Sequence, residues 1–285
     1  MATGAPRAAS GSASPSRGNT AYRHPLPVRI SHWLNLLFLL VLLGSGLQIF
    51  NAHPSLYWGS RSDADHALLS MQARPGEDGS LQGVTAVFGR EFITTGVLGA
   101  SEGPSGMVEN RGFPSWATIP GSRWLAMGRR WHFFFAWLFV INWAVYVGYT
   151  LASRRHRHDF FPSRAELKGA GTSLRAHFSP RRLRSEAAHG YNALQKVSYI
   201  VVIFALVPLI ILTGLTMSPW LNAAFPWMLD LFDGRQSART IHFVAAFGFV
   251  LFTLVHISML LLVGPLNHLR AMVTGRLRIP REEMR

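Results

Sequence analysis

The sequence predicts an all-α integral membrane protein, a four-helix bundle with one long outer loop. Three observations favour this class. The chain of 285 residues is 49% hydrophobic and contains four apolar runs of bilayer length. Its positive charge lies on alternate connections between these runs, and several histidines lie inside the runs.

The four runs contain no Asp, Glu, Lys or Arg. Each is about 20 residues long, and about 20 helical residues span a hydrocarbon core of about 30 Å. Core helices of soluble proteins are usually shorter than this. The sequence therefore predicts membrane-spanning helices at 31–50, 131–151, 197–217 and 241–263.

The charges predict the orientation of the bundle. Residues 1–30 carry four Arg and no acid, residues 152–196 have a net charge of +7, and residues 264–285 have +3. The connections 51–130 and 218–240 are neutral, so these three segments account for the whole net charge of +14. Positive flanks stay in the cytoplasm, which places both termini and the 152–196 loop inside. Nucleic-acid binding is disfavoured because no separate basic domain exists.

The segments outside the helices divide the chain further. Residues 1–24 are rich in Ala, Gly and Ser and predict a disordered cytoplasmic tail. Residues 271–285 are expected to form a cytoplasmic tail at the other end of the chain. The membrane domain between them spans 25–270. Its outer loop of about 80 residues, 51–130, is too long for a simple turn and predicts a short strand pair around TAVFGREFITTG. The inner loop covers 152–196.

Four histidines match in depth across three of the predicted helices. His32 lies near the inner end of the first run, and His132 lies near the outer end of the second. The fourth run carries His242 at its outer end and His256 at its inner end. Fourteen helical residues rise about 21 Å and return to nearly the same face. The sequence thus predicts two stacked pairs, His132 with His242 and His32 with His256.

Histidine pairs at these depths indicate bound metal, because an unpartnered polar side chain in the membrane is costly. Two imidazoles complete the axial ligation of a haem iron, and the porphyrin fills an apolar bundle interior. Zinc is the rival metal, but no thiol or carboxylate accompanies either pair. The prediction is two haems b. Four glycines are candidates for making room for porphyrin: Gly44, Gly46, Gly214 and Gly248.

One further histidine competes for the outer site. His53 follows the first run on the outer side and is an alternative to His132. Pro54 comes next and disfavours helical geometry at His53, which favours His132. The other histidines lie in polar connections and are expected to be surface residues: His24, His66, His156, His158, His177, His189 and His268.

Six segments within residues 23–270 form a recognisable combination: HPLPVRISHWLN, GLQIFNAHPSLYWG, GRRWHFFFAW, YNALQK, TGLTMSP and IHF…VHI. In these segments the chain resembles the bacterial cytochrome b561 and nickel–iron hydrogenase cytochrome b family. It is most similar in pattern to cytochrome b subunits of thiosulfate reductase and related molybdenum-enzyme systems. The resemblance implies a di-haem, quinone-linked electron-transfer subunit with the same four histidines as ligands. The long outer loop departs from the short one of the formate dehydrogenase members.

A quinone site is predicted where the inner loop re-enters the membrane. Tyr191, Asn192 and Gln195 supply neutral hydrogen-bonding groups in an otherwise apolar or cationic setting. The resemblance places the quinone near this turn. The alternative is ordinary helix-start chemistry, with Asn192 as the N-cap.

The function favoured by these features is that of an electron-transfer subunit of a respiratory oxidoreductase in the bacterial inner membrane. It would connect the quinone pool to an outer-face redox protein, a molybdopterin enzyme by resemblance. The alternative is a self-contained quinone oxidoreductase that acts on a diffusible species such as superoxide. A transporter is disfavoured, because the midplane of the predicted helices is almost wholly apolar.

Overall fold

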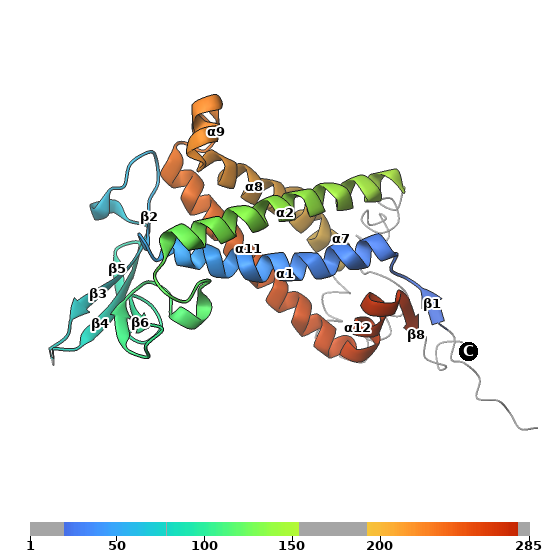
Figure 1. Cartoon of the computed structure of the whole chain (residues 1–285), viewed down its shortest axis with the longest axis horizontal. Coiled ribbons are helices and arrows are strands. Elements are labelled where there is room, and N and C mark those ends of the chain that lie inside the picture. Colours follow the sequence, from blue (N-terminus) through green and yellow to red (C-terminus); the bar gives the residue numbers. More distant parts are fainter. Residues whose placement is uncertain (1–19, 78, 154–192, 279–285) are drawn as a thin grey trace, which may run out of the picture.

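The computed structural model describes residues 20–77, 79–153 and 193–278. Four helices in this part of the chain are long and apolar enough to cross a membrane, which confirms the four predicted spans. The third span consists of three consecutive segments, α7, η3 and α8 (Figure 1). The spans are α1 (Leu26–Phe50), α2 (Leu125–Ala152), α7 (Ala193–Ile200) with η3 (Val201–Leu206) and α8 (Val207–Thr216), and α11 (Arg235–Val263).

The first, second and fourth helices begin before the predicted residues. α1 begins at Leu26 and not 31, α2 at Leu125 and not 131, and α11 at Arg235 and not 241. The predicted runs stopped at the first charged residue. A helix can continue through arginines near its ends, such as Arg29 and Arg129, because their long side chains can keep the charge at the membrane interface.

A π-helical stretch interrupts the third span, and Pro208 explains it. Val207 donates its backbone N–H to the Val202 carbonyl, five residues back. The next bond in this register would come from Pro208, which has no N–H. The Ile203 carbonyl is instead satisfied by the Trp143 indole of α2, at 3.0 Å. A neighbouring helix thus replaces the lost backbone bond, as apolar surroundings require.

The outer segment between α1 and α2 is a β-module, and "all-α" therefore describes only the membrane part. Leu56, Met71 and Phe113 pack with Phe50 at the end of α1. Two antiparallel sheets, in the orders β2-β3-β4-β5 and β6-β7, build the module beyond the helix ends (Figure 1). Its elements are β2 (Ser55–Leu56), η1 (Ala64–His66), β3 (Leu69–Pro75), β4 (Leu81–Val87), β5 (Arg90–Ile93), β6 (Ala100–Glu102), β7 (Val108–Asn110) and η2 (Ser115–Ala117).

The predicted strand pair is the β4–β5 hairpin, which confirms that prediction. Val87 pairs with Arg90, and the two residues between them form the turn. Phe88 and Gly89 both have positive φ, 48° and 77°, as a type I′ hairpin turn requires. Glycine adopts this conformation freely, and Phe88 is held in it by its position in the hairpin.

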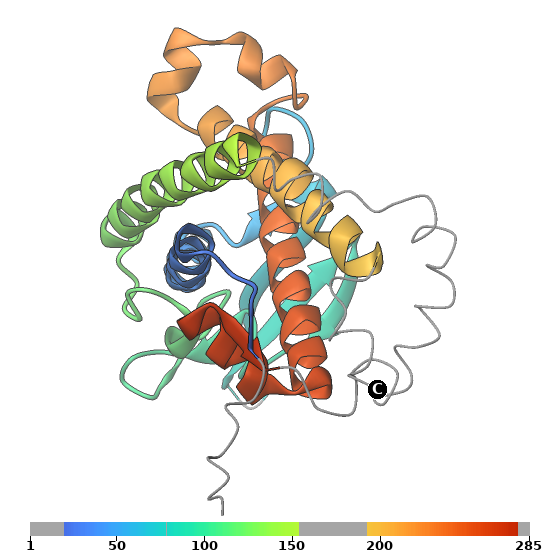
Figure 2. The same cartoon turned by 90° about the vertical axis from the view of Figure 1, so that its right-hand side faces the viewer.

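The opposite end of the bundle brings the two described chain ends together. β1 (Thr20–Tyr22) pairs with β8 (Arg276–Arg278), and α12 (Pro265–Thr274) lies between α11 and β8 (Figure 2). Residues 20–24 and 271–278 were expected to belong to the tails, but parts of both segments form regular secondary structure. The rest of the predicted tails, and residues 154–192 of the inner loop, fall outside the described residues. We call this end inner, following the predicted orientation.

The helices associate as two hairpins, and the structure places a polar contact inside the first. α1 packs along α2, and α8 packs along α11 (Figures 1 and 2). Asn142 of α2 donates to Asn35 Oδ1 at 2.7 Å and to the Ser31 carbonyl at 3.2 Å, both on α1. The helix interior is therefore less uniformly apolar than the sequence suggested. Two short helices, α9 (Pro219–Ala224) and α10 (Trp227–Asp230), form the outer link between α8 and α11.

Candidate functional site: two histidine pairs

The outer pair joins α2 to α11. His132 lies in the second turn of α2, and His242 lies in the second turn of α11. Their ring centres are 6.2 Å apart, with an angle of 64° between the ring planes. The two imidazoles that the sequence pairs by depth thus lie against each other.

Each outer histidine is held by a hydroxyl of the neighbouring helix. His132 Nδ1 lies 3.1 Å from Ser45 Oγ of α1. His242 Nδ1 lies 3.1 Å from Thr213 Oγ1 of α8, and also 3.1 Å from the Ile210 carbonyl. A carbonyl can only accept a hydrogen bond, so His242 carries its proton on Nδ1. Its Nε2 is then unprotonated and available as a metal ligand.

Glycines follow both hydroxyl residues and let the rings approach the helices. A Cβ at Gly46 would lie 3.4 Å from His132 Cε1, and one at Gly214 would lie 3.3 Å from His242 Cε1. The other two candidate glycines serve different neighbours. Gly44 faces the Ile119 side chain of the β-module, and Gly248 faces Leu206. The expectation that glycines make room for porphyrin is therefore wrong for Gly44, whose space the β-module fills.

The inner pair joins α1 to α11. The ring centres of His32 and His256 are 6.3 Å apart, with an interplanar angle of 54°. Trp33 meets His32 edge-on at 5.4 Å, and Phe252 stacks on His256 at 5.9 Å. His32 Nδ1 is buried and has no hydrogen-bond partner among the described residues. Among the described residues, His32 therefore lacks a hydroxyl partner like the one that Ser45 gives His132.

In each pair, the distance between the two ring centres fits one metal ion between the imidazoles. In metal sites an imidazole nitrogen lies about 2 Å from the metal, which puts the ring centre about 3 Å from it. Two rings on opposite sides of one metal would then have centres about 6 Å apart. The observed 6.2 and 6.3 Å agree with this arrangement. Two axial imidazoles are the ligand set of a low-spin haem.

His53, the alternative outer candidate, lies elsewhere. It follows α1, stacks on Tyr57 and is 3.1 Å from the Tyr57 hydroxyl. Burial lowers the pKa of His53, and the nearby Arg239 lowers it further. The structure therefore brings His132, and not His53, against His242.

Only one of the three predicted quinone residues lies in the described part of the chain. Tyr191 and Asn192 fall outside it, while Gln195 is half-buried in the first turn of α7. One turn further, the Tyr199 ring lies 6.4 Å from Phe252, which stacks on His256. A chain of aromatic contacts thus connects α7 to the inner pair.

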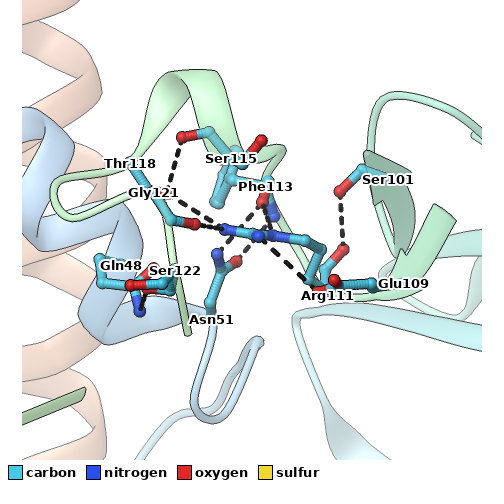
Figure 3. A network of polar contacts seen from close by, with 10 residues as sticks. All are labelled: Gln48, Asn51, Ser101, Glu109, Arg111, Phe113, Ser115, Thr118, Gly121 and Ser122. Atoms are coloured by element: carbon cyan, nitrogen blue, oxygen red, sulfur yellow. Dashed lines mark hydrogen bonds and ion pairs between the residues drawn. The ribbon is translucent and has the colours of Figure 1, made fainter. Parts of the chain in front are cut away.

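A buried arginine holds together the segment of the β-module that contacts the outer end of α1 (Figure 3). Arg111, 1% exposed, donates to the Phe113 carbonyl, Thr118 Oγ1 and the Gly121 carbonyl at 2.8, 3.1 and 3.1 Å. Asn51, just after α1, exchanges two hydrogen bonds with the Phe113 backbone. Burial lowers the pKa of the Arg111 guanidinium, and Glu109, 3.9 Å away, opposes this shift.

The sequence reasoning missed Ser45, Thr213 and Arg111. A common signal existed for the first two: a hydroxyl residue followed by Gly-Leu, near the outer end of one helix in each hairpin. No comparable local signal marks Arg111, whose partners lie up to ten residues further along the chain.

Four membrane-length helices and two imidazole pairs at opposite ends of the bundle form the arrangement that the resemblance to b-type cytochromes predicts. The chain belongs to the prokaryotic cytochrome b561 family, whose sequence profile matches residues 23–275 and confirms the resemblance. This membership makes it a membrane electron-transfer protein and implies haem b as its cofactor.

One curated relative extends over nearly the whole chain. It is the protein named "Putative protein-methionine-sulfoxide reductase subunit YedZ1" from Azospira oryzae. The two are 27% identical over 252 residues, which cover 88% of this chain and 96% of the relative. No solved structure matches the chain.

Proposed function

We propose that this chain carries electrons through two haems b between a quinone at the inner end of the bundle and a redox protein at the outer end. His32 and His256 would hold the inner haem, and His132 and His242 the outer one. A bound haem takes up and releases one electron through its iron. The residues of the chain hold the two irons at separate depths and keep their surroundings apolar.

The observation that supports this function is that one helix, α11, takes part in both imidazole pairs. α11 supplies one ring to each pair, at residues 242 and 256, and the rings meet partners at 6.2 and 6.3 Å. Fourteen helical residues correspond to a rise of about 21 Å. Two haems at these positions would divide electron transfer across the membrane into shorter steps, so that no electron has to cross the whole membrane in a single transfer.

The experiment that tests this function uses the full-length chain in liposomes. We expect two low-spin b haems per chain, reduced by an added quinol. We also expect rapid reoxidation by an exported molybdopterin reductase of the same bacterium added outside. If superoxide exchanges electrons with the chain as fast as that reductase does, the self-contained quinone oxidoreductase is the better description.

Two features support an outer protein partner. The β-module exposes apolar side chains around the edge strand β5, including Phe88, Phe92 and Ile93, which are 77%, 53% and 63% exposed. Exposed apolar patches and edge strands are common protein-binding surfaces. The Azospira relative is named as a reductase subunit, which favours a reductase as the partner. By the family resemblance, we propose a molybdopterin enzyme.

The quinone is proposed to bind beside α7. Gln195 lies one turn from Tyr199, whose ring contacts lead through Phe252 to His256. The Gln195 amide would supply the neutral donor that a quinone carbonyl needs. Tyr191 and Asn192 stay in the proposal as further polar groups of the same turn.

Replacing Gln195 with leucine is expected to slow haem reduction by a quinol several-fold. The side chain keeps its approximate bulk but loses its polar contacts, a loss on the order of 1–3 kcal/mol if these are buried. Stopped-flow absorbance measures the rate, and dithionite reduction should be unchanged. Ser198→Ala is the matched control, because its hydroxyl donates to the Gln195 carbonyl within the helix. Equal quinol rates in both variants would place the quinone elsewhere.

The orientation of the chain is expected to follow its charges. A reporter fused after Arg285 should read as cytoplasmic, because the positive charge lies on that side. A reporter inserted in the β-module, within residues 75–110, should read as periplasmic. Paired alkaline phosphatase and fluorescent protein fusions measure both positions. The reverse pattern would exchange the inner and outer sites throughout.

A further inference from the structure

We propose that Ser45 and Thr213 are positioning residues for the outer haem. Their hydroxyls accept the Nδ1 protons of His132 and His242, aim both Nε2 atoms at the iron, and lower the reduction potential of that haem. This inference rests on the proposed function, because it assumes that these two histidines hold a haem.

The direction of the hydrogen bonds follows from the bonds that each hydroxyl makes to its own helix. Ser45 Oγ donates to the Val41 carbonyl at 2.6 Å, and Thr213 Oγ1 donates to the Leu209 carbonyl at 2.8 Å. A hydroxyl has one proton, so each oxygen is left with only acceptor capacity toward the ring nitrogen 3.1 Å away. The histidine must therefore be the donor.

The arrangement occurs twice at one site. Ser45 and Thr213 come from different hairpins, are both fully buried at 0% exposure, and are each followed by a glycine that lets the ring approach. The Ile210 carbonyl also accepts from the His242 ring at 3.1 Å. Two helices thus present the same combination of hydroxyl and glycine to the two outer rings.

The inner pair is built differently. Nδ1 of His32 is buried without a hydrogen-bond partner among the described residues. Aromatic rings flank the pair, with Trp33 edge-on to His32 and Phe252 stacked on His256. The structure therefore distinguishes the two sites by the hydrogen bonding of their ligands.

This difference has a chemical consequence for the iron. An imidazole that donates from Nδ1 has a more basic Nε2 and is a stronger ligand. A stronger donor stabilises the more positively charged oxidised iron over the reduced iron, which lowers the potential. Loss of such outer contacts typically weakens metal binding about 10–100-fold. Because the Ile210 carbonyl still accepts from His242 when a hydroxyl is removed, we expect the lower end of this range.

The test measures both midpoint potentials by spectroelectrochemistry in the full-length chain with its haems. In Thr213→Val, a valine methyl replaces the hydroxyl at nearly constant shape, and Ser45→Ala removes the other hydroxyl. We expect each variant to weaken the binding of the oxidised outer haem about tenfold more than the binding of the reduced one. This corresponds to a rise of about 59 mV for a one-electron couple. The inner potential should not move.

Two further variants separate hydrogen bonding from packing. Thr216 is fully buried on the same helix, and its hydroxyl donates to the Leu212 carbonyl at 2.8 Å. Thr216→Val should therefore leave both potentials unchanged. Thr213→Ser keeps the hydroxyl and should retain the original outer potential.

The outcomes decide between the inference and the function on which it rests. Two haems with unchanged potentials in Thr213→Val and Ser45→Ala would overturn the positioning role and leave the proposed function intact. If Thr213→Val loses the outer haem, retention in Thr213→Ser supports the role of the hydroxyl, and loss in both overturns it. A wild-type chain without an outer haem would overturn both proposals.

Discussion

Replacing His242 with alanine is expected to remove the outer haem and to leave the inner one in place. His242 is one of only two rings at the outer site and faces His132 at 6.2 Å. Without it, a haem at this site would keep one axial imidazole and lose the ligand field of the low-spin state. The purified variant should contain one haem, with the spectrum of the inner site alone.

The reciprocal and control variants make this prediction specific. His256→Ala should remove the inner haem only, because His256 faces His32 at 6.3 Å. His53→Ala should keep both haems, since His53 contacts Tyr57 and not the outer pair. Haem is counted by pyridine haemochrome assay against protein mass. Two low-spin haems in His242→Ala, or loss of the outer haem in His53→Ala, would refute the assignment.

The membrane spans and the histidine pairing are the features most predictable from the sequence. Apolar surroundings impose a nearly complete run of uncharged residues, and a helix fixes the depth of each residue by its 1.5 Å rise. The structure brings His32 to His256 and His132 to His242, as the depths predict. Their role as haem ligands stays a prediction.

The groups that hold the histidines were less predictable, for a physical reason. A buried Ser or Thr in a helix can bond to its own backbone and needs no other partner. Ser45 and Thr213 do this and also contact a histidine ring. Thr216 makes the same kind of bond to its own helix, with no ring contact among the described residues. Only the packing of two helices distinguishes these cases.

The β-module shows the same limit for long-range pairing. The β4–β5 hairpin is predictable from a short stretch of sequence, because its turn, Phe88–Gly89, is local and contains a glycine. The pairing of β2 with β3 joins residues 55–56 to 69–70 across a long connection, with no comparable turn signal. Arg111 likewise gains its partners only when residues 113–121 fold back over it.

Replacing Arg111 with methionine is expected to loosen residues 111–122, the segment of the β-module that contacts the outer end of α1. The change removes donors from the Phe113 carbonyl, Thr118 Oγ1 and the Gly121 carbonyl in a side chain that is 1% exposed. Unpaired buried acceptors cost about 1–3 kcal/mol each, although such costs are not additive. Part of this cost is offset, because the methionine variant no longer buries the Arg111 guanidinium, whose Nη1 has no hydrogen-bond partner among the described residues.

A net local loss of about 3 kcal/mol would raise the open population of residues 111–122 about 100-fold, because each 1.4 kcal/mol corresponds to a factor of ten. Hydrogen exchange and limited proteolysis of this segment should accelerate accordingly, while the haem content stays at the wild-type value. The helices keep their own packing, so the effect should remain outside them. Arg74→Met is the matched control, since the Arg74–Glu91 ion pair lies on the exposed surface of the same module. Exposed pairs contribute little. Equal exchange rates for residues 111–122 in the two variants would show that the buried arginine does not stabilise this segment.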